Sequence, residues 1–322
     1  MFGGRKYQVG IGKESSRGIA VAPSFWLPKE DVTVDNKKQY VNNDSSMGVI
    51  HDSNDARIVK EWSEGEVTGK VRDKSFGLLL LGSFGSVSSA LHESETLVYD
   101  HTFSVANTNA HQSLTLEVKN ELEQLKYALG VVSSLKITAI VGKFVEFACA
   151  FKAKKGSAST NGVVYTSENE FISKHATLKI ASDLVGLDLA EAVNVKSIEI
   201  SINKNIEEHD VLGSMEPVDY ANKEFSVDGN IEAVFEDLDT FKNVFEEGIL
   251  KAIRIDIKSD AIIGTASNSE LKIDLASVSL QDWSRKSGNN DIVTQTIKFK
   301  AHYSLSDAKM LEAVLTNTQV NY

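Results

Sequence analysis

The chain has 322 residues, enough for one large β-rich domain or two of ordinary size, and its 42% hydrophobic and 25% charged residues are typical of a globular protein. A formal net charge of −11 argues against a protein that binds nucleic acid stably, because such binding depends on lysine and arginine contacts to phosphate. The first residues lack the apolar segment of a secretory signal, and the longest apolar run, Phe76–Phe84, is far shorter than the roughly 20 residues of a membrane helix. We therefore expect a chain that is made and folded in the cytoplasm, without membrane insertion.

Residues 1–38 are predicted to form an N-terminal arm rather than part of a core. Four glycines within the first 12 residues interrupt any period, and Pro23 and Pro28 bracket a short apolar segment at 25–27. Because an extended arm with aromatic side chains usually docks on another surface, we expect it to lie on its own domain or on a neighbouring chain.

A first β-rich repeat is predicted over residues 39–155, and it opens with a long hairpin. Strand segments at Tyr40–Val41 and Ile58–Trp62 enclose the segment Asn42–Arg57. That segment is crowded with Asn, Asp and Ser, which favour turns, so we expect a long polar loop between the two strands.

The same repeat continues with a strand that alternates small or apolar residues with polar ones over 64–71, followed by a helical pattern at 76–80. Asp73 and Ser75 are candidate caps for that helix. The single cysteine, Cys149, excludes an internal disulfide and lies in an apolar run, so we expect a buried, inert thiol. Further strands are predicted at Thr96–Val105, Ser113–Val118, Gly130–Ile140 and Lys143–Lys152.

Residues 156–175 are predicted to be a linker, since the polar, glycine- and serine-containing segment Lys152–Asn161 leads into them. A second repeat follows over 176–305, with its own long polar loop at Lys204–Asn222, and a C-terminal arm over 306–322 that holds a short helix or strand. Strands are predicted at Thr177–Ile180, Lys196–Asn203, Leu250–Lys258, Glu270–Leu275 and Asp291–Tyr303, with a short helical or irregular insertion at Asp183–Ala192.

The clearest pattern of the chain lies in this second repeat. Apolar or small residues occupy alternate positions over Phe225–Phe235, which predicts a half-buried antiparallel strand. The period then changes, because Phe241, Val244 and Phe245 have helical spacing behind Asp237 and Asp239, which can cap a first turn.

The two repeats follow the same order of strand, long loop, strand, helix and strands. Gly65 aligns with Gly229, and Asp73 aligns with Asp237. We interpret this as a tandem duplication. The predicted fold is mainly β: an antiparallel β-sandwich or barrel with one flanking α-helix in each repeat.

No motif for catalysis, a cofactor or a metal is found. Gly10 and Gly12 do not have the spacing of a phosphate-binding loop, and no nucleophile elbow or zinc-binding pattern is present. Residues 52–55 resemble part of a calcium loop but lack its glycine and its final glutamate. Asp237 and Asp239 could be an acid–base pair, but their place before a helix favours capping. We therefore expect a protein that is not an enzyme and has no cofactor.

Several stretches resemble the tail tube proteins of long-tailed, non-contractile bacteriophages. The likeness spans nearly the whole chain, and its segments read VGIGKESSRGIAVAPSFWLP, EGEVTGKVRDKSFGLLLLGSFG, LGSMEPVDYANKEFSVDGNIEAVFEDLDTFKNVF, IVTQTIKFKAHYS and NTQVNY. The resemblance implies a structural virion protein, assembled in the host cytoplasm, whose rings stack into a hollow tail tube that conducts DNA to the host. It also implies three partners: the tape-measure protein, the tail terminator and the distal tail protein. The variety with a duplicated domain implies rings of three chains with pseudo-six-fold symmetry, and rings of six chains are the alternative.

The resemblance directs attention to the lumen of the tube, which in this family is typically acidic, so that genomic DNA slides through without specific binding. The polar side of the two alternating strands, at 64–71 and 225–235, supplies the candidates, and an ordinary solvated sheet face is the alternative interpretation. The lumen-facing candidates are Glu64, Glu66, Thr68, Ser226, Asp228, Asn230 and Glu232.

The two long polar loops are the candidates for contacts between stacked rings, together with both arms. The alternative is that these loops contact nothing. The candidates are Asn43, Asp44, Met47, His51, Asp52, Asp55, Glu207, Glu208, Met215 and Asp219.

Three other classes of protein are alternatives to a non-contractile tail tube protein. A tube protein of a contractile tail or a secretion system shares the fold, but such proteins are usually single-domain. A β-sandwich binding or adhesion module would cluster exposed aromatic residues, whereas Trp26, Trp62 and Trp283 are scattered. A β-rich hydrolase would need a convergent catalytic site, which no motif supplies.

Overall fold

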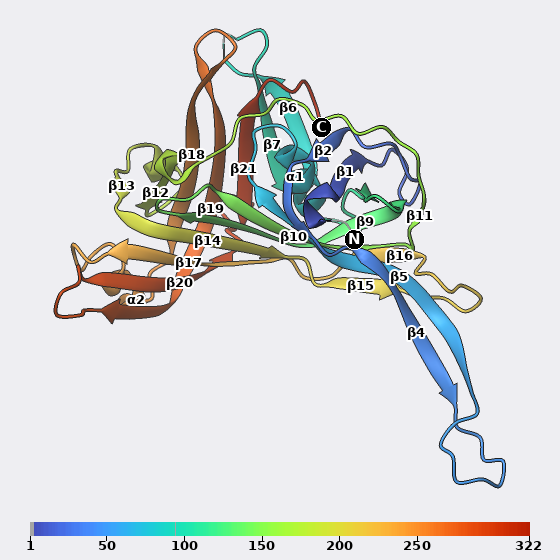
Figure 1. Ribbon diagram of the computed structural model, residues 1–322. Helices are drawn as coiled ribbons and strands as arrows, with labels where there is room; N and C mark the ends of the chain where they lie inside the picture. Colours follow the sequence, from blue (N-terminus) through green and yellow to red (C-terminus); the bar gives the residue numbers. More distant parts are fainter. Residues whose placement is uncertain (1–2, 94) are drawn as a thin grey trace.

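The computed structural model describes residues 3–93 and 95–322, and it is built mainly of antiparallel strands (Figure 1). The first part contains β1 (Gln8–Lys13), β2 (Phe25–Leu27), β3 (Lys29–Val32), β4 (Asp35–Asn43), β5 (Asp55–Lys70), α1 (Phe76–Phe84), β6 (Gly85–Leu91), β7 (Tyr99–Val105), β8 (Leu114–Lys119), β9 (Gln124–Ile140), β10 (Glu146–Ala153) and β11 (Ser157–Ala158). The second part contains β12 (Ala176–Ala181), β13 (Ala192–Val193), β14 (Val195–Asn203), β15 (Ile206–His209), β16 (Asp219–Asn222), β17 (Ser226–Val234), α2 (Lys242–Glu247), β18 (Lys251–Ile263), β19 (Ser267–Lys286), β20 (Thr294–His302) and β21 (Leu311–Asn317). The prediction of a mainly β, antiparallel fold with flanking helices is confirmed.

A central antiparallel sheet runs through the molecule in the order β5, β10, β9, β14, β17, β20, β19. One face of this sheet is apolar because every second residue of each strand points to the core. Directly opposite residues form buried rows across the strands, such as Val67, Cys149, Leu135 and Ile202. The expectation of a buried Cys149 is confirmed, and burial raises the pKa of its thiol far above the ordinary value.

Two strands, β9 and β19, are long enough to pair with strands of the central sheet and also with strands of a second layer. The first part of β9 pairs with β8, whose other neighbour is β1, while its second part pairs with β10 and β14. The first part of β19 pairs with β18 and β21, and its second part pairs with β20. Helix α1 packs between the layers against β9, and α2 packs against β19. All nine residues of α1 are buried.

The central sheet consists of two halves with the same strand pairings. In the first half, β3 and β4 pair with β5, β5 with β10, and β10 with β9. In the second half, β14 pairs with β17, β17 with β20, and β20 with β19. Gly65 lies opposite Phe151 in the first half, and Gly229 lies opposite Phe299 in the second. The halves meet where β9 pairs with β14.

Two β-bulges also fall at the same places in both halves. Ser133 is the extra residue where β9 pairs with β10, and Gln281 is the extra residue where β19 pairs with β20. Likewise, Glu30 is extra where β3 pairs with β5, and Lys196 is extra where β14 pairs with β17. Because a bulge shifts the register of every pair beyond it, two matched bulges relate the halves residue by residue.

The N-terminal segment differs from the predicted arm. It supplies β1, β2 and β3 to the fold, and Val9, Ile11 and Trp26 are almost fully buried. The glycines that suggested an irregular arm permit close packing, since a Cβ on Gly12 would lie 2.6 Å from the carbonyl oxygen of Ala22. Of the two surfaces expected for this segment, its own domain or a neighbouring chain, the structure places it on its own domain.

Other differences concern short strands and helix caps. The predicted second loop contains the hairpin β15–β16, and the serine-rich strand β6 was not predicted. Ser75 does not cap α1 with its side chain; its hydroxyl donates to Glu168 at 2.7 Å. Asp237 does accept a hydrogen bond from the Thr240 N–H at 2.7 Å in the turn before α2.

Candidate functional site

The seven residues predicted to face a lumen lie on one polar face of the central sheet. Their strands, β5 and β17, are connected through β10, β9 and β14 by continuous registers in which directly opposite residues share a face. Val67 and Val227, which alternate with them, point to the other face and are fully buried. We call this surface the polar face; on β5 and β17 it carries Glu64, Glu66, Thr68, Ser226, Asp228, Asn230 and Glu232.

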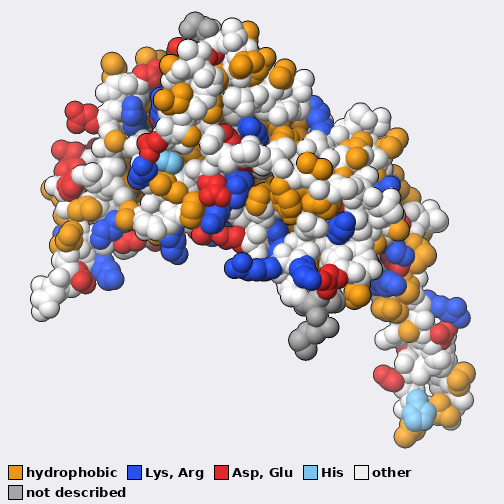
Figure 2. All heavy atoms as spheres, turned by 45° about the horizontal axis from the view of Figure 1, so that its top comes forward, with side chains coloured by type: hydrophobic (Ala, Val, Ile, Leu, Met, Phe, Trp, Pro, Cys, Tyr) orange, Lys and Arg blue, Asp and Glu red, His pale blue; other side chains and the backbone are white. Residues whose placement is uncertain are grey.

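Lysines stand opposite several carboxylates on the polar face. Lys152 lies opposite Glu64 and Lys300 opposite Asp228. The Lys136 ammonium lies 2.6 Å from the Glu199 carboxylate, and that of Lys298 lies 3.2 Å from Asp282. The polar face is therefore of mixed charge, with the two signs paired across strands. Figure 2 shows basic and acidic side chains interspersed over the visible surface.

Sequence reasoning missed these lysines because it considered β5 and β17 alone. Lys298 and Lys300 alternate with the buried Ile297 and Phe299 in β20, and this alternation is a signal that the sequence does contain. Which carboxylate each lysine meets depends on the pairing of distant strands, and that pairing was not available from the sequence.

The first candidate stacking loop forms the tip of a hairpin that projects from the body of the molecule (Figure 1). All nine residues of β4 are exposed, and at the tip the Met47 side chain is 68% exposed. Among the residues that the structure describes, short-range contacts hold the tip, such as the hydrogen bond from the Asn54 N–H to the Asn43 carbonyl oxygen at 3.0 Å. The structure places six of the candidates in this hairpin: Asn43, Asp44, Met47, His51, Asp52 and Asp55.

The second candidate loop, in contrast, folds back onto the first repeat. The Met215 carbonyl oxygen accepts a hydrogen bond from the Glu61 N–H at 2.8 Å, and Asp219 forms an ion pair with Arg17 at 2.7 Å. Glu207 forms an exposed ion pair with Lys223 at 3.0 Å. The tip itself remains exposed between β15 and β16.

Glu208 ties this second hairpin to strands of the first sheet half. Its carboxylate contacts the ammonium groups of Lys60 and Lys152, the latter at 2.6 Å. Burial alone would raise the pKa of Glu208, but the hydrogen bonds from the two lysines outweigh burial and lower that pKa. The structure therefore brings Glu208 together with β5 and β10, and this carboxylate anchors the hairpin to its own chain.

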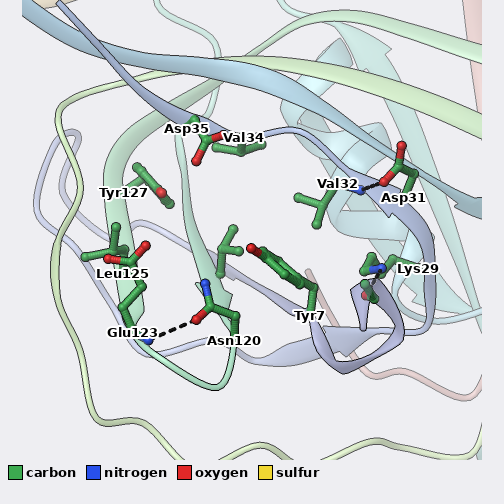
Figure 3. A pocket seen from close by; sticks show the side chains of 12 residues that line it. Tyr7, Lys29, Asp31, Val32, Val34, Asp35, Asn120, Glu123, Leu125 and Tyr127 are labelled. Carbon is green, nitrogen blue, oxygen red and sulfur yellow. Dashed lines mark hydrogen bonds between the residues drawn. The ribbon is translucent and has the colours of Figure 1, made fainter. Parts of the chain in front are cut away.

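One concave site of the surface borders the N-terminal segment. Figure 3 shows a pocket of about 250 Å³ between the turn before β1, strand β3 and the β8–β9 turn. Among the contacts drawn in it, the Val32 N–H donates to Asp31 at 2.8 Å, and the Glu123 N–H donates to Asn120 at 2.9 Å. Within residues 3–93 and 95–322, no group of three or more His, Cys, Asp or Glu side chains could hold a metal ion. In the same residues, no helix is long and apolar enough to cross a membrane.

These features define a mainly β, antiparallel protein whose unpaired strand edges present backbone N–H and C=O groups to which another strand can bind. The family model for phage tail tube proteins matches residues 4–301, and the chain belongs to the phage tail tube protein family. Among curated proteins, the comparison finds no match to this chain. Membership of the family gives the chain a structural role in the virion tail, with self-assembly into stacked rings.

Proposed function

We propose that three copies of this chain form a ring of six repeats, and that these rings stack into the hollow tube of a non-contractile tail. The observation that carries the proposal is the likeness of the two sheet halves, which share the same order of strand pairings and two bulges at equivalent places. A chain with two equivalent halves occupies two adjacent positions of a six-fold arrangement, so three chains complete it.

The proposed repeats are the tandem tube domains at 39–155 and 176–305, joined by the linker 156–175. The strand β3 and the start of β4, from the segment 1–38, complete the first sheet half as β14 completes the second. The segment 306–322 supplies β21, which links β19 to β7.

We propose that the polar face lines the lumen, through which DNA passes without specific binding. Its candidate residues on β5 and β17 alternate with buried ones. This alternation is expected for barrel strands that have one face toward a hollow interior and the other toward a packed core. Lysines that are paired with carboxylates on the same face have less charge to offer to phosphate. A face whose lysines are paired with carboxylates thus binds DNA weakly, as a purely acidic face does.

The projecting β4–β5 hairpin is the proposed contact between successive rings, since its exposed tip has no partner among the described residues of its own body. Within the tail, the proposed partners at the tube ends are the tail terminator and the distal tail protein. The tape-measure protein and then DNA occupy the lumen. Rings form in the host cytoplasm before they join the virion.

Electron microscopy of the purified full chain tests this function. Hollow tubes are expected at high protein concentration, or after addition of a tail-initiation complex that provides a first ring. Persistent monomers under both conditions would contradict the proposal and favour a β-sandwich binding module.

A further inference from the structure

The junction between the two sheet halves shows how one repeat binds the next. Strand β9 pairs with β14 in antiparallel register, with Ser134 opposite Asn203, Lys136 opposite Ser201, and Thr138 opposite Glu199. This junction lies within one chain. In a ring of repeats, however, every second junction must lie between chains.

The outer edge of β19 corresponds to the edge of β9 that binds β14. Because Gln281 and Ser133 are equivalent bulge residues, Asp282 and Ser284 occupy the places of Ser134 and Lys136. Within the described residues, β19 from position 281 onward pairs with β20 on one side only. Its side chains there are exposed except for that of Trp283, which is half-buried.

The outer edge of β3 and β4 corresponds to the edge of β14 that binds β9. Because Glu30 and Lys196 are equivalent bulge residues, Asp35 and Lys37 occupy the places of Ser201 and Asn203. On this edge the Val32 N–H donates to the Asp31 side chain at 2.8 Å instead of to a strand, as Figure 3 shows.

The two edges lie at opposite ends of the central sheet, near β20 and near β5 (Figure 1). We infer that β19 of one chain pairs with β3 and β4 of a second copy in the register of the internal junction. Asp282 then lies opposite Lys37, Ser284 opposite Asp35, and Lys286 opposite Thr33. This inference rests on the proposed ring, and it names the surface that closes the ring.

Charge complementarity supports this register independently of the likeness between the two sheet halves. It places the Asp282 carboxylate directly across from the Lys37 ammonium, and the Lys286 ammonium diagonally across from the Asp35 carboxylate. In the internal junction the equivalents of Asp282 and Lys37 are the uncharged Ser134 and Asn203. The opposite charges therefore occur at the free edges, where two separate chains must find one register.

The hydrogen-bond directions identify which pair is suited to a disulfide test. The Thr33 N–H donates to the Glu66 carbonyl oxygen at 2.9 Å, so Thr33, Asp35 and Lys37 direct their backbone groups toward β5. Opposite Asp282, Lys37 would therefore form a non-hydrogen-bonded pair, in which Cα atoms are about 4.5 Å apart. That separation lies in the range of disulfide bonds.

The experiment uses two double variants of the full chain: Asp282→Cys with Lys37→Cys, and the matched control Asp282→Cys with Lys38→Cys. Lys38 is adjacent and of the same type, but its side chain points to the other face of the strand. The native Cys149 is fully buried and does not compete. Both variants are assembled under reducing conditions, imaged by electron microscopy, oxidised, and analysed on non-reducing gels.

We expect the Lys37 variant to give covalent dimers and closed trimers in at least tenfold greater yield than the Lys38 variant. Rings or tubes in which the two variants cross-link equally, or not at all, would overturn the inferred register and leave the tube function standing. Failure of the unaltered chain to form any ring or tube would overturn the proposed function, and this inference with it.

Discussion

At the scale of single residues, Lys204 is the least expected feature of the fold. It follows β14, its side chain is fully buried, and its ammonium donates a hydrogen bond to the Gly82 carbonyl oxygen at 2.7 Å. Gly82 lies in the last turn of α1, where carbonyl groups lack partners within the helix and favour a positive charge. Lys204 thus joins the start of the long second hairpin to the helix of the first repeat.

A pH dependence of stability follows from this burial. Burial lowers the pKa of Lys204 from 10.5 to about 7, so above pH 7 the unfolded chain binds a proton that the folded chain does not. The free energy of unfolding of the unaltered chain should therefore rise by about 1 kcal/mol per pH unit relative to that of Lys204→Met between pH 7 and 9. Urea unfolding of the two proteins at pH 7, 8 and 9 measures this difference.

Lys223→Met is the matched control for this measurement, because Lys223 lies in the same region with an exposed side chain. Its stability should keep a constant offset from that of the unaltered chain across the same pH range. A constant offset for Lys204→Met as well would show that Lys204 keeps an ordinary pKa in the folded chain.

At the scale of elements, the two long hairpins have different roles although they occupy equivalent places. The second hairpin is anchored to β5 and β10 through Glu208 and its two lysines. The first has an exposed apolar tip, with Val49 55% and Ile50 102% exposed, and its contacts within the described part of the chain are short-range. An apolar tip on a projecting hairpin is a surface for a partner, and in the proposed tube that partner is the adjacent ring.

Deletion of Ser45–Asp52 tests the role of this tip. It leaves Asp44, Ser53 and Asn54 between the paired residues Asn43 and Asp55, and a hairpin tolerates a three-residue loop. We expect a folded chain with nearly unchanged thermal unfolding that forms rings but no extended tubes, because the sheet edges are intact and the tip is lost. Circular dichroism and electron microscopy measure the two properties.

A second variant, in which a Gly/Ser segment of equal length replaces residues 45–52, separates the reach of the hairpin from the chemistry of its tip. If the exposed apolar side chains make the contact, this variant should also fail to polymerise. Tubes of normal length from the deletion variant would remove the hairpin from the stacking contact.

The elements that the sequence predicted well are those with a sustained period. The strand at 226–234, the helix at 76–84 and the loop of the first hairpin all follow local patterns of alternation, helical spacing and turn residues. Strands β1 and β6 show no alternation of buried and exposed residues, and the glycines of β1 and the serines of β6 suggest a loop. Their place in the sheets depends on partners that are distant in the chain.

The candidate surfaces were predictable to a similar extent. Alternation in β5 and β17 placed the seven polar residues on one face, because each strand by itself fixes its two sides. The lysines across from them, the docking of Glu208 and the free edges of β19 and β3 all depend on which strands are neighbours. These are properties of the tertiary fold, and no single segment contains them.

At the scale of the whole molecule, the central feature is the likeness between the two halves of the central sheet. The matched bulges and registers relate the two sheet halves as one unit repeated. The β9–β14 junction inside the chain is an example of the strand pairing that is absent at the two ends of the central sheet. An open sheet with two complementary edges closes when enough copies join, and closure removes the exposed edges. The proposed ring follows from this geometry together with membership of the tail tube family.

The number of chains in each ring tests this account most directly. Cryo-electron microscopy of assembled tubes, with helical reconstruction, counts the chains and locates the junctions between them. The account predicts three chains per ring, with six similar sheet units around the lumen and alternate junctions inside and between chains. Six chains per ring would contradict the assignment of the two halves to adjacent positions of one six-fold arrangement.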